Sequence, residues 1–297
     1  MTDGAQPKRI VLAGASGTIG GAVASALVAD GHDVMCLSRA DFADAGSLAE
    51  ALAKAKPDTV VSCIASRSGS PKDAQAVDYQ ANVDLLVAAK SAGVGHFILL
   101  SAICVQRPKL AFQHAKLAFE TELEASGIDW TIIRPTAFFK SLSGQIDRVR
   151  KGKPFLLFGD GELTRCKPIS DGNLARFIVD CVGDDKQRNQ VLPIGGPGPA
   201  ISPKQQGAML FELTGKEPRY RSVSPSLFMA ASRVLSLGAG ISDWMAEKAE
   251  YARIAHYYAT ESMLVLDPET GEYSAEVTPE FGSETLKDHY RRQLEQL

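Results

Sequence analysis

The sequence predicts an α/β fold in which a doubly wound parallel sheet is followed by a smaller C-terminal part. Two observations lead to this prediction. Short apolar runs alternate with helix-length segments over the first 135 residues, which is the pattern of βαβ units. The runs are apolar throughout and do not alternate with polar residues, as is usual for strands covered by helices on both faces.

The elements of the sheet region follow in order along the chain. Strands are predicted for the apolar runs 9–13, 33–37, 59–64, 96–100 and 130–134. Helices are predicted for the segments between them, 18–30, 47–54, 78–91 and 109–125. Pro135 ends the last of these strands, because proline has no N–H group to donate to a neighbouring strand.

The regular alternation ends after about residue 140. Gly, Pro and Asp cluster in FGDGEL, IGGPGPAISP and LDPETGEY, and helices are expected at 173–181 and 203–214. We therefore divide the chain into residues 1–157, which hold most of the sheet, and residues 158–297. The second part is expected to be mainly a substrate-binding or lid region that packs on the first and is not an independent domain.

One apolar segment of the second part has roughly helical spacing. Its apolar residues are Leu227, Ala231, Val234, Leu235, Ile241, Trp244 and Met245. A helix over 227–245 is expected, and three roles stay open for it. The first role is a lid or substrate wall, the second a core or oligomer-contact helix, and the third an interfacial helix in contact with a membrane.

The composition excludes several classes of function. The 297 residues include 45% hydrophobic residues and carry a net charge of −3, so no broad basic surface is available to bind nucleic acid. No apolar segment approaches the roughly 18 residues of a membrane span. The N-terminal MTDGAQPKR shows no leader pattern. The five cysteines lack the short spacing of a metal site, so we expect buried thiols in a reduced, cytoplasmic protein and no bound metal.

A glycine-rich turn joins the first strand to the first helix, with the sequence Gly14-Ala-Ser-Gly17-Thr-Ile-Gly20. Glycine lets the backbone turn sharply and approach a pyrophosphate, and the free N–H groups of the helix attract its phosphates. The turn predicts an NAD(P)-binding Rossmann fold. Its spacing resembles the atypical branch of the short-chain dehydrogenase/reductase superfamily. That resemblance implies pyrophosphate contacts at Gly14, Ser16, Gly17, Thr18 and Ile19.

Arg39 follows the second strand, where NAD-preferring members of that superfamily place an acidic residue. Its planar guanidinium suits a 2′-phosphate, so NADPH is the predicted cofactor. Asp41 and Phe42 resemble the adenine-edge contact of the superfamily.

Further cofactor contacts are expected at the carboxyl ends of later strands, because doubly wound sheets bind ligands there. Ala65 and Ser66 are expected to border the nicotinamide ribose. Pro135 and Phe138 are expected at the nicotinamide edge.

The helix after the fourth strand departs from the pattern of carbonyl reductases in this superfamily, which carry Tyr-x-x-x-Lys there. Lys116 is retained, but Phe112 stands in the place of the tyrosine. Because phenylalanine donates no proton, alcohol–ketone chemistry is not expected. A conjugated C=C bond, which delocalises charge, needs no acid at this position. Lys116 then positions the cofactor and stabilises charge; a solvated helix lysine is the alternative.

Several longer segments resemble the divinyl chlorophyllide a 8-vinyl-reductases. They occur in order at 100–106, 112–117, 133–142, 158–161, 166–170, 191–197, 257–263 and 266–273. The chain lacks the transit segment and the long connection between the second and third strands of the plant members, so a bacterial member of the family is expected.

The resemblance implies an enzyme that uses NADPH to reduce the 8-vinyl group of divinyl chlorophyllide a, or of divinyl protochlorophyllide, to ethyl. Such a flat Mg-tetrapyrrole needs a large apolar pocket with a few polar anchors. Phe138 and Phe139 are expected to face it, and Lys140 and Arg165 to pair with its carboxylates. The alternatives are core packing for the phenylalanines and solvated surface for the cations. His114 is one candidate proton source.

Two other functions stay open. An enzyme with the same fold could reduce a quinone or a phenylpropanoid C=C bond, whereas a regulator of the NmrA type would bind the dinucleotide and a protein partner without turnover. Peripheral contact with a photosynthetic membrane is compatible with the sequence, which does not decide between a monomer and a homo-oligomer.

Overall fold

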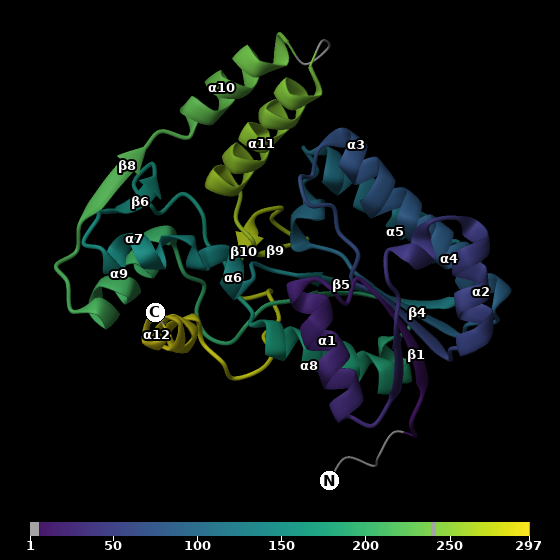
Figure 1. The fold of residues 1–297 in the computed structure, drawn as a ribbon. Coiled ribbons are helices and arrows are strands. Elements are labelled where there is room, and N and C mark those ends of the chain that lie inside the picture. Colours follow the sequence, from purple (N-terminus) through teal and green to yellow (C-terminus); the bar gives the residue numbers. More distant parts are fainter. Residues whose placement is uncertain (1–5, 239–241, 297) are drawn as a thin grey trace.

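The larger part of the molecule is built around a six-stranded parallel sheet (Figure 1). The computed structural model describes residues 6–238 and 242–296. The strands are β1 (Arg9–Ala13), β2 (Asp33–Cys36), β3 (Thr59–Ser62), β4 (His96–Leu100), β5 (Asp129–Pro135) and β7 (Gln190–Ile194), in the order β2-β1-β3-β4-β5-β7. The chain leaves β2 on one side of β1 and returns as β3 on the other, and ligands bind doubly wound sheets at such a reversal.

Helices cover both faces of this sheet, which confirms the predicted fold class. One face carries α1 (Thr18–Ala29) and α8 (Asp171–Gly183), and the other carries α2 (Ala45–Ala55), α4 (Ala81–Ser91) and α5 (Ala111–Glu124). Alternate residues of β1 enter opposite cores: Ile10 and Leu12 pack toward α1, and Val11 and Ala13 toward α2. Burial on both faces explains why the strands are apolar throughout.

Two elements of this layered unit come from beyond residue 158. Strand β7 pairs in parallel with β5, from Thr131 opposite Gln190 to Pro135 opposite Ile194, and α8 packs against α1. Pro193 is tolerated in β7 because this strand is at the edge of the sheet. The division at residue 157 therefore describes most, but not all, of each part.

The helix predicted at 78–91 begins earlier than expected. A short helix α3 (Pro71–Asp73) leads into a π-helical segment η2 (Ala74–Gln80), which continues as α4. The side chain of Ser70 caps this helical run by accepting a hydrogen bond from the N–H group of Asp73. π-Helical turns are rare and frequently occur at functional sites.

The smaller part is built around a second hydrophobic core. It contains the parallel pair β6 (Phe155–Phe158) and β8 (Tyr220–Val223), with α6 (Phe139–Leu142), α7 (Ile146–Arg150), α9 (Pro203–Thr214) and α12 (Leu286–Glu295). Tyr290 of α12 is fully buried and donates its hydroxyl to the carbonyl of Leu142 at 2.9 Å. The C-terminal helix is thereby fastened to α6. Short 3₁₀ turns lie at η1 (Ala40–Phe42), η3 (Ile103–Gln106), η4 (Ser143–Gln145) and η5 (Asp185–Gln187).

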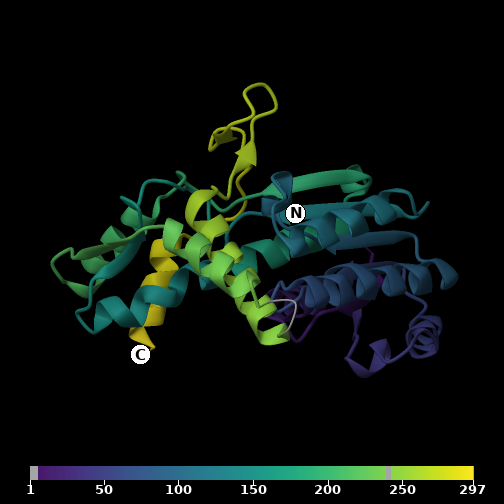
Figure 2. The ribbon, with the colours of Figure 1, turned by 90° about the horizontal axis from the view of Figure 1, so that it is seen from above.

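Two hairpins complete the second part. The helix expected at 227–245 is a pair of helices, α10 (Ser226–Ser236) and α11 (Asp243–Thr260), which extend away from the small core (Figure 1). Ile241 lies outside the described residues. The hairpin of β9 (Val265–Leu266) and β10 (Tyr273–Ser274) stands out from the body of the molecule in Figure 2. Across the described ranges, the structure contains no helix with the length and apolar character needed to cross a membrane.

The cysteines follow the prediction with one exception. Cys104, Cys166 and Cys181 are buried and Cys63 is half-buried, but Cys36 at the end of β2 is exposed. The apolar run around Cys36 predicts burial, whereas β2 is an edge strand whose last residue reaches solvent.

Candidate active site

The loop between β1 and α1 is shaped by glycines that no other residue could replace. Gly14 has φ +87°, and a Cβ atom there would lie 2.6 Å from the carbonyl oxygen of Cys63. A Cβ atom at Gly20 would lie 2.1 Å from the carbonyl oxygen of Gly14. Gly17 begins α1 without a side-chain cap, so the N–H groups of the first turn are available to a ligand. This cradle fits the pyrophosphate of a dinucleotide.

A lysine from the smaller part reaches this loop. Ser16 and Thr18 are exposed at its rim, and Ile19 is half-buried. The ammonium of Lys140 in α6 donates a hydrogen bond to Oγ1 of Thr18 at 2.6 Å. The structure therefore places Lys140 beside the dinucleotide loop, and the predicted pairing of Lys140 with a substrate carboxylate stays a prediction. The pairing joins residues 122 positions apart, which no local pattern reveals.

The turn after β2 presents Arg39 to solvent. Oδ2 of Asp41 accepts hydrogen bonds from the backbone N–H and the hydroxyl of Ser38, both at 2.7 Å. These bonds lower the pKa of Asp41, so the carboxylate stays ionised and holds the turn. Asp41, expected at the adenine edge, thus has a structural role in positioning Arg39, while Phe42 packs against the core under α2.

Lys116 and Ser66, both expected near the nicotinamide ribose, meet at one carboxylate. Oδ1 of Asp78 lies 3.0 Å from the ammonium of Lys116 and accepts the N–H group of Ser66 at 3.3 Å. Lys116 is buried, so it is not a solvated helix lysine. Asp78 is 1% exposed, and its Oδ2 has no hydrogen-bond partner among the residues that the structure describes. Sequence reasoning missed Asp78 because the π-helical turn that aims it at Lys116 has no visible signature.

Phe112 occupies the position on α5 that corresponds to the tyrosine of the carbonyl reductases. A Cβ atom at Gly69 would lie 3.3 Å from the Phe112 ring and 2.9 Å from Cδ1 of Ile254 in α11. The ring is therefore covered by the loop after β3 and by α11. Ala65, in the same loop, is exposed. The surroundings of Phe112 are apolar and suit a ring without a hydroxyl group.

A cavity of about 500 Å³ lies where β4 and β5 end. Its apolar walls come from both parts of the chain and include Ala102, Ile103, Phe138, Leu142, Phe155 and Met263. Polar groups are fewer, among them Arg165, Gln206, Tyr258 and Glu261. An apolar cavity with a few polar anchors is typical of a small-molecule site.

The residues predicted for the substrate separate into two groups. Phe138 and Arg165 line the cavity, and Arg165 also pairs with Glu162 at 3.0 Å. Pro135, which is expected at the nicotinamide edge, lines the same cavity. Phe139 is 2% exposed and packs against the ring of His289. It belongs to the core under the cavity, because in the short helix α6 it turns away from its neighbour Phe138.

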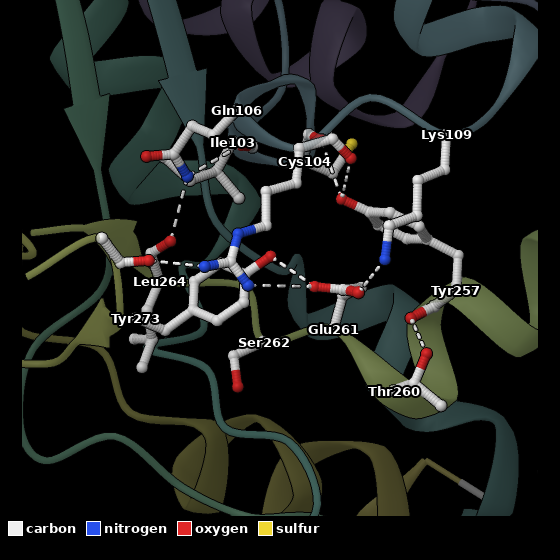
Figure 3. A network of polar contacts seen from close by, with 12 residues as sticks. Ile103, Cys104, Gln106, Lys109, Tyr257, Thr260, Glu261, Ser262, Leu264 and Tyr273 are labelled. Carbon is white, nitrogen blue, oxygen red and sulfur yellow. Dashed lines mark hydrogen bonds and ion pairs between the residues drawn. The ribbon is translucent and has the colours of Figure 1, made fainter.

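A polar network anchors α11 beside the cavity (Figure 3). Glu261, at the end of this helix, pairs with Lys109 and accepts the hydroxyl of Tyr273 at 2.8 Å. Tyr257 donates its hydroxyl to the carbonyls of Cys104 and Arg107 at 2.9 and 3.1 Å. The network ties α11 and the β9–β10 hairpin to the turn that follows β4. None of these contacts was predicted from the sequence.

Comparison with known proteins agrees with this geometry. Residues 14–185 match the family model described as NAD(P)H-binding. The "Divinyl chlorophyllide a 8-vinyl-reductase, chloroplastic" of Cucumis sativus is 54% identical over 80% of this chain and 58% of its own length. The protein of the same name in Oryza sativa subsp. indica is 44% identical over 95% of this chain and 78% of its own length.

A solved structure shares the fold at lower identity. An NADPH-dependent quinone oxidoreductase from Escherichia coli, complexed with NADPH, superimposes with a TM-score of 0.66 at 18% identity. The match covers 96% of this chain and 99% of the quinone oxidoreductase chain. The family model and the two plant relatives show that the chain belongs to the divinyl chlorophyllide a 8-vinyl-reductase family of oxidoreductases, built on an NAD(P)H-binding domain.

Proposed function

We propose that this chain reduces the 8-vinyl group of divinyl chlorophyllide a, or of divinyl protochlorophyllide, to ethyl, with NADPH as cofactor. The names of the plant relatives support the reaction, although the chain spans only 58% of the length of the cucumber protein. The single observation that carries the proposal is the site itself. A buried Lys116 and an apolar Phe112 lie on α5, and α5 packs on the η3 turn, whose Ile103 and Cys104 line the apolar cavity.

Different residues of the chain bind different parts of the cofactor and the pigment. The glycine loop and Lys140 hold the pyrophosphate, and Arg39 holds the 2′-phosphate that distinguishes NADPH from NADH. Asp78 keeps the ammonium of Lys116 beside the nicotinamide ribose. The bound cofactor supplies the hydride. Phe138 and the other apolar residues of the cavity hold the edge of the macrocycle, and Arg165 pairs with a carboxylate of the pigment.

The test is an absorbance spectrum of the purified chain mixed with NADPH and divinyl chlorophyllide a. Loss of one conjugated vinyl group shifts the Soret band to the blue, and the product is two mass units heavier. We expect this change with NADPH and not with NADH. An unchanged spectrum, in a protein that still binds NADPH, would refute the proposal.

A quinone is the second candidate acceptor, because the fold matches a quinone oxidoreductase. Its reduction is followed with the same protein by NADPH oxidation without pigment. A regulator without turnover would bind NADP⁺ and NADPH and reduce neither acceptor.

Peripheral membrane contact is a further part of the proposal. Leu227, Leu237 and Trp244 of the α10–α11 region are at least 60% exposed, and exposed apolar side chains favour an interface with lipid. Flotation with anionic vesicles tests this contact. The same experiment with Leu237→Ser shows whether the hairpin makes it.

A further inference from the structure

We propose that Tyr258 of α11 is the proton donor of the vinyl reduction. This inference rests on the function proposed above, and it names the acid that replaces the tyrosine absent from position 112. It follows from four features of the structure: the lining of the cavity, the contact between Tyr258 and Cys104, the fastening of α11, and the exposure of the competing acids.

The stoichiometry requires one proton in addition to the hydride. Reduction converts R–CH=CH₂, reduced nicotinamide and one proton into R–CH₂–CH₃ and oxidised nicotinamide. The hydride goes to the terminal carbon, and the π electrons pass into the macrocycle. The O–H bond of Tyr258 then breaks, and its proton forms the new C–H bond at the inner vinyl carbon. The phenolate that is left takes a proton from water.

Tyr258 lies at the wall where the reaction is expected. It lines the 500 Å³ cavity together with Ala102 and Cys104, which follow β4, and Phe138, which follows β5. Its hydroxyl lies 3.9 Å from Sγ of Cys104, which is a weak contact that leaves the proton free to be donated. The phenol therefore reaches the cavity from α11.

The helix that presents Tyr258 is held firmly at this position. The neighbouring Tyr257 hydrogen-bonds two carbonyls of the η3 turn, and its ring contacts that of Tyr258 edge to face, with centroids 5.7 Å apart. Gln113 also donates to the carbonyl of Cys104, at 3.0 Å. Glu261, at the end of α11, is fixed by Lys109 (Figure 3). Such fixed placement is what general acid catalysis needs.

The other acids around the cavity suit the role less well. Burial alone would raise the pKa of Glu261, but hydrogen bonds from Lys109 and Tyr273 outweigh it and lower that pKa, so the carboxylate holds no proton. Cys104 and Cys166 also line the cavity, but they are only 4% and 6% exposed. The side chain of Tyr258 is 46% exposed as a whole, but its hydroxyl lies against the buried Sγ of Cys104, so its proton is returned through the cavity that Tyr258 lines.

The first experiment compares Tyr258→Phe with Tyr251→Phe, a matched control at a 67% exposed position of the same helix. We expect Tyr258→Phe to lower kcat about 100-fold or more, as for the loss of a general acid. The Kd values for NADP⁺ and for divinyl chlorophyllide a, measured separately by fluorescence, should change less than about twofold. Tyr251→Phe should match the wild type.

The second experiment places 3,5-difluorotyrosine at position 258 and, as the control, at position 251. Burial raises the pKa of Tyr258 well above its ordinary value, so the wild-type kcat should not fall up to about pH 9. The more acidic difluorophenol should introduce an alkaline limb. In the cofactor-free protein, the ¹⁹F resonance at 258 should shift when divinyl chlorophyllide a is added, and the one at 251 should not.

Each outcome has one meaning. A wild-type rate for Tyr258→Phe, or a pH profile that fluorination leaves unchanged, overturns the role of Tyr258 while the proposed function stands. A wild-type chain that reduces no divinyl pigment overturns the proposed function and this inference with it. An unchanged ¹⁹F resonance at 258, in a protein that binds the pigment, shows that the phenol does not touch it and also overturns the inference.

Discussion

The ammonium of Lys116 and Oδ1 of Asp78 form an ion pair at 3.0 Å, and both side chains are buried. The pair joins α5 to the π-helical turn η2 at the end of the sheet where a dinucleotide binds. Within residues 6–238 and 242–296, the second carboxylate oxygen of Asp78 has no hydrogen-bond partner. The positive charge of Lys116 is thus held in one place before any ligand arrives, as preorganised sites require.

Asp78→Asn should therefore destabilise the chain. Removing one partner of a buried ion pair costs about 3–5 kcal/mol, because the remaining charge is left uncompensated. Urea unfolding at pH 7 gives the free energy of unfolding for this variant, for Lys116→Met and for the double variant. We expect the double variant to be more stable than the sum of the two single changes predicts. Additive losses would contradict the pairing.

Lys140→Gln should weaken dinucleotide binding. The ammonium of Lys140 lies against Thr18 at the start of α1, and we propose that it contacts the pyrophosphate there. Loss of one charge-assisted contact should raise the Kd for NADP⁺ about tenfold, and the effect should shrink at high salt. Lys151→Gln, at a 60% exposed lysine side chain, is the control. Equal Kd values for the two variants would remove Lys140 from the cofactor site.

Arg39→Ala should change the preference between cofactors. Because the guanidinium suits a 2′-phosphate, the KM for NADPH should rise about tenfold or more while the KM for NADH changes little. Steady-state kinetics with both cofactors measure the ratio. Arg67→Ala, another exposed arginine near the cofactor cleft, should leave the ratio unchanged. A proportional rise for both cofactors would exclude the 2′-phosphate role.

His96 should make stability fall in mild acid. Its Nε2 lies 2.9 Å from Oγ1 of Thr131, and burial lowers its pKa from 6.5 to about 4. Between these values the unfolded chain binds one more proton than the folded chain, so the free energy of unfolding falls by up to about 1.4 kcal/mol for each pH unit below 6.5. The contribution of neutral, buried His96 to the free energy of unfolding is complete above pH 6.5 and is lost as the pH falls to about 4.

Urea unfolding at several pH values between 4 and 7 measures this slope. His96→Gln should flatten it, although the variant itself is less stable. His114→Gln, at an exposed position of α5, should keep the wild-type slope. An unaltered slope in His96→Gln would assign the acid sensitivity to other groups.

The sheet was predictable because strands that are buried on both faces consist of continuous apolar residues. Strands β1 to β5 lie within two residues of their predicted ends. Strand β7 was not predicted, since Pro193 interrupts its pattern and its tolerance depends on an edge position that only the folded sheet defines.

The site was predictable where function depends on local sequence. The glycine loop, Lys116 and Phe112 each follow from spacing along one element. Asp78 and Tyr258 do not follow from local spacing. A π-helical turn orients Asp78 toward Lys116, and tertiary contacts of α11 orient Tyr258. Lys140 shows the same limit, since its partner Thr18 is distant in the chain.

The late arrival of β7 has a consequence for folding during synthesis. Until residues 190–194 leave the ribosome, the outer edge of β5 has unpaired N–H and C=O groups, and such an edge is a template for aggregation. Helix α8 emerges shortly before β7 and covers α1 first. A nascent chain stalled before residue 190 should therefore be more prone to aggregate than one released after β7 has paired.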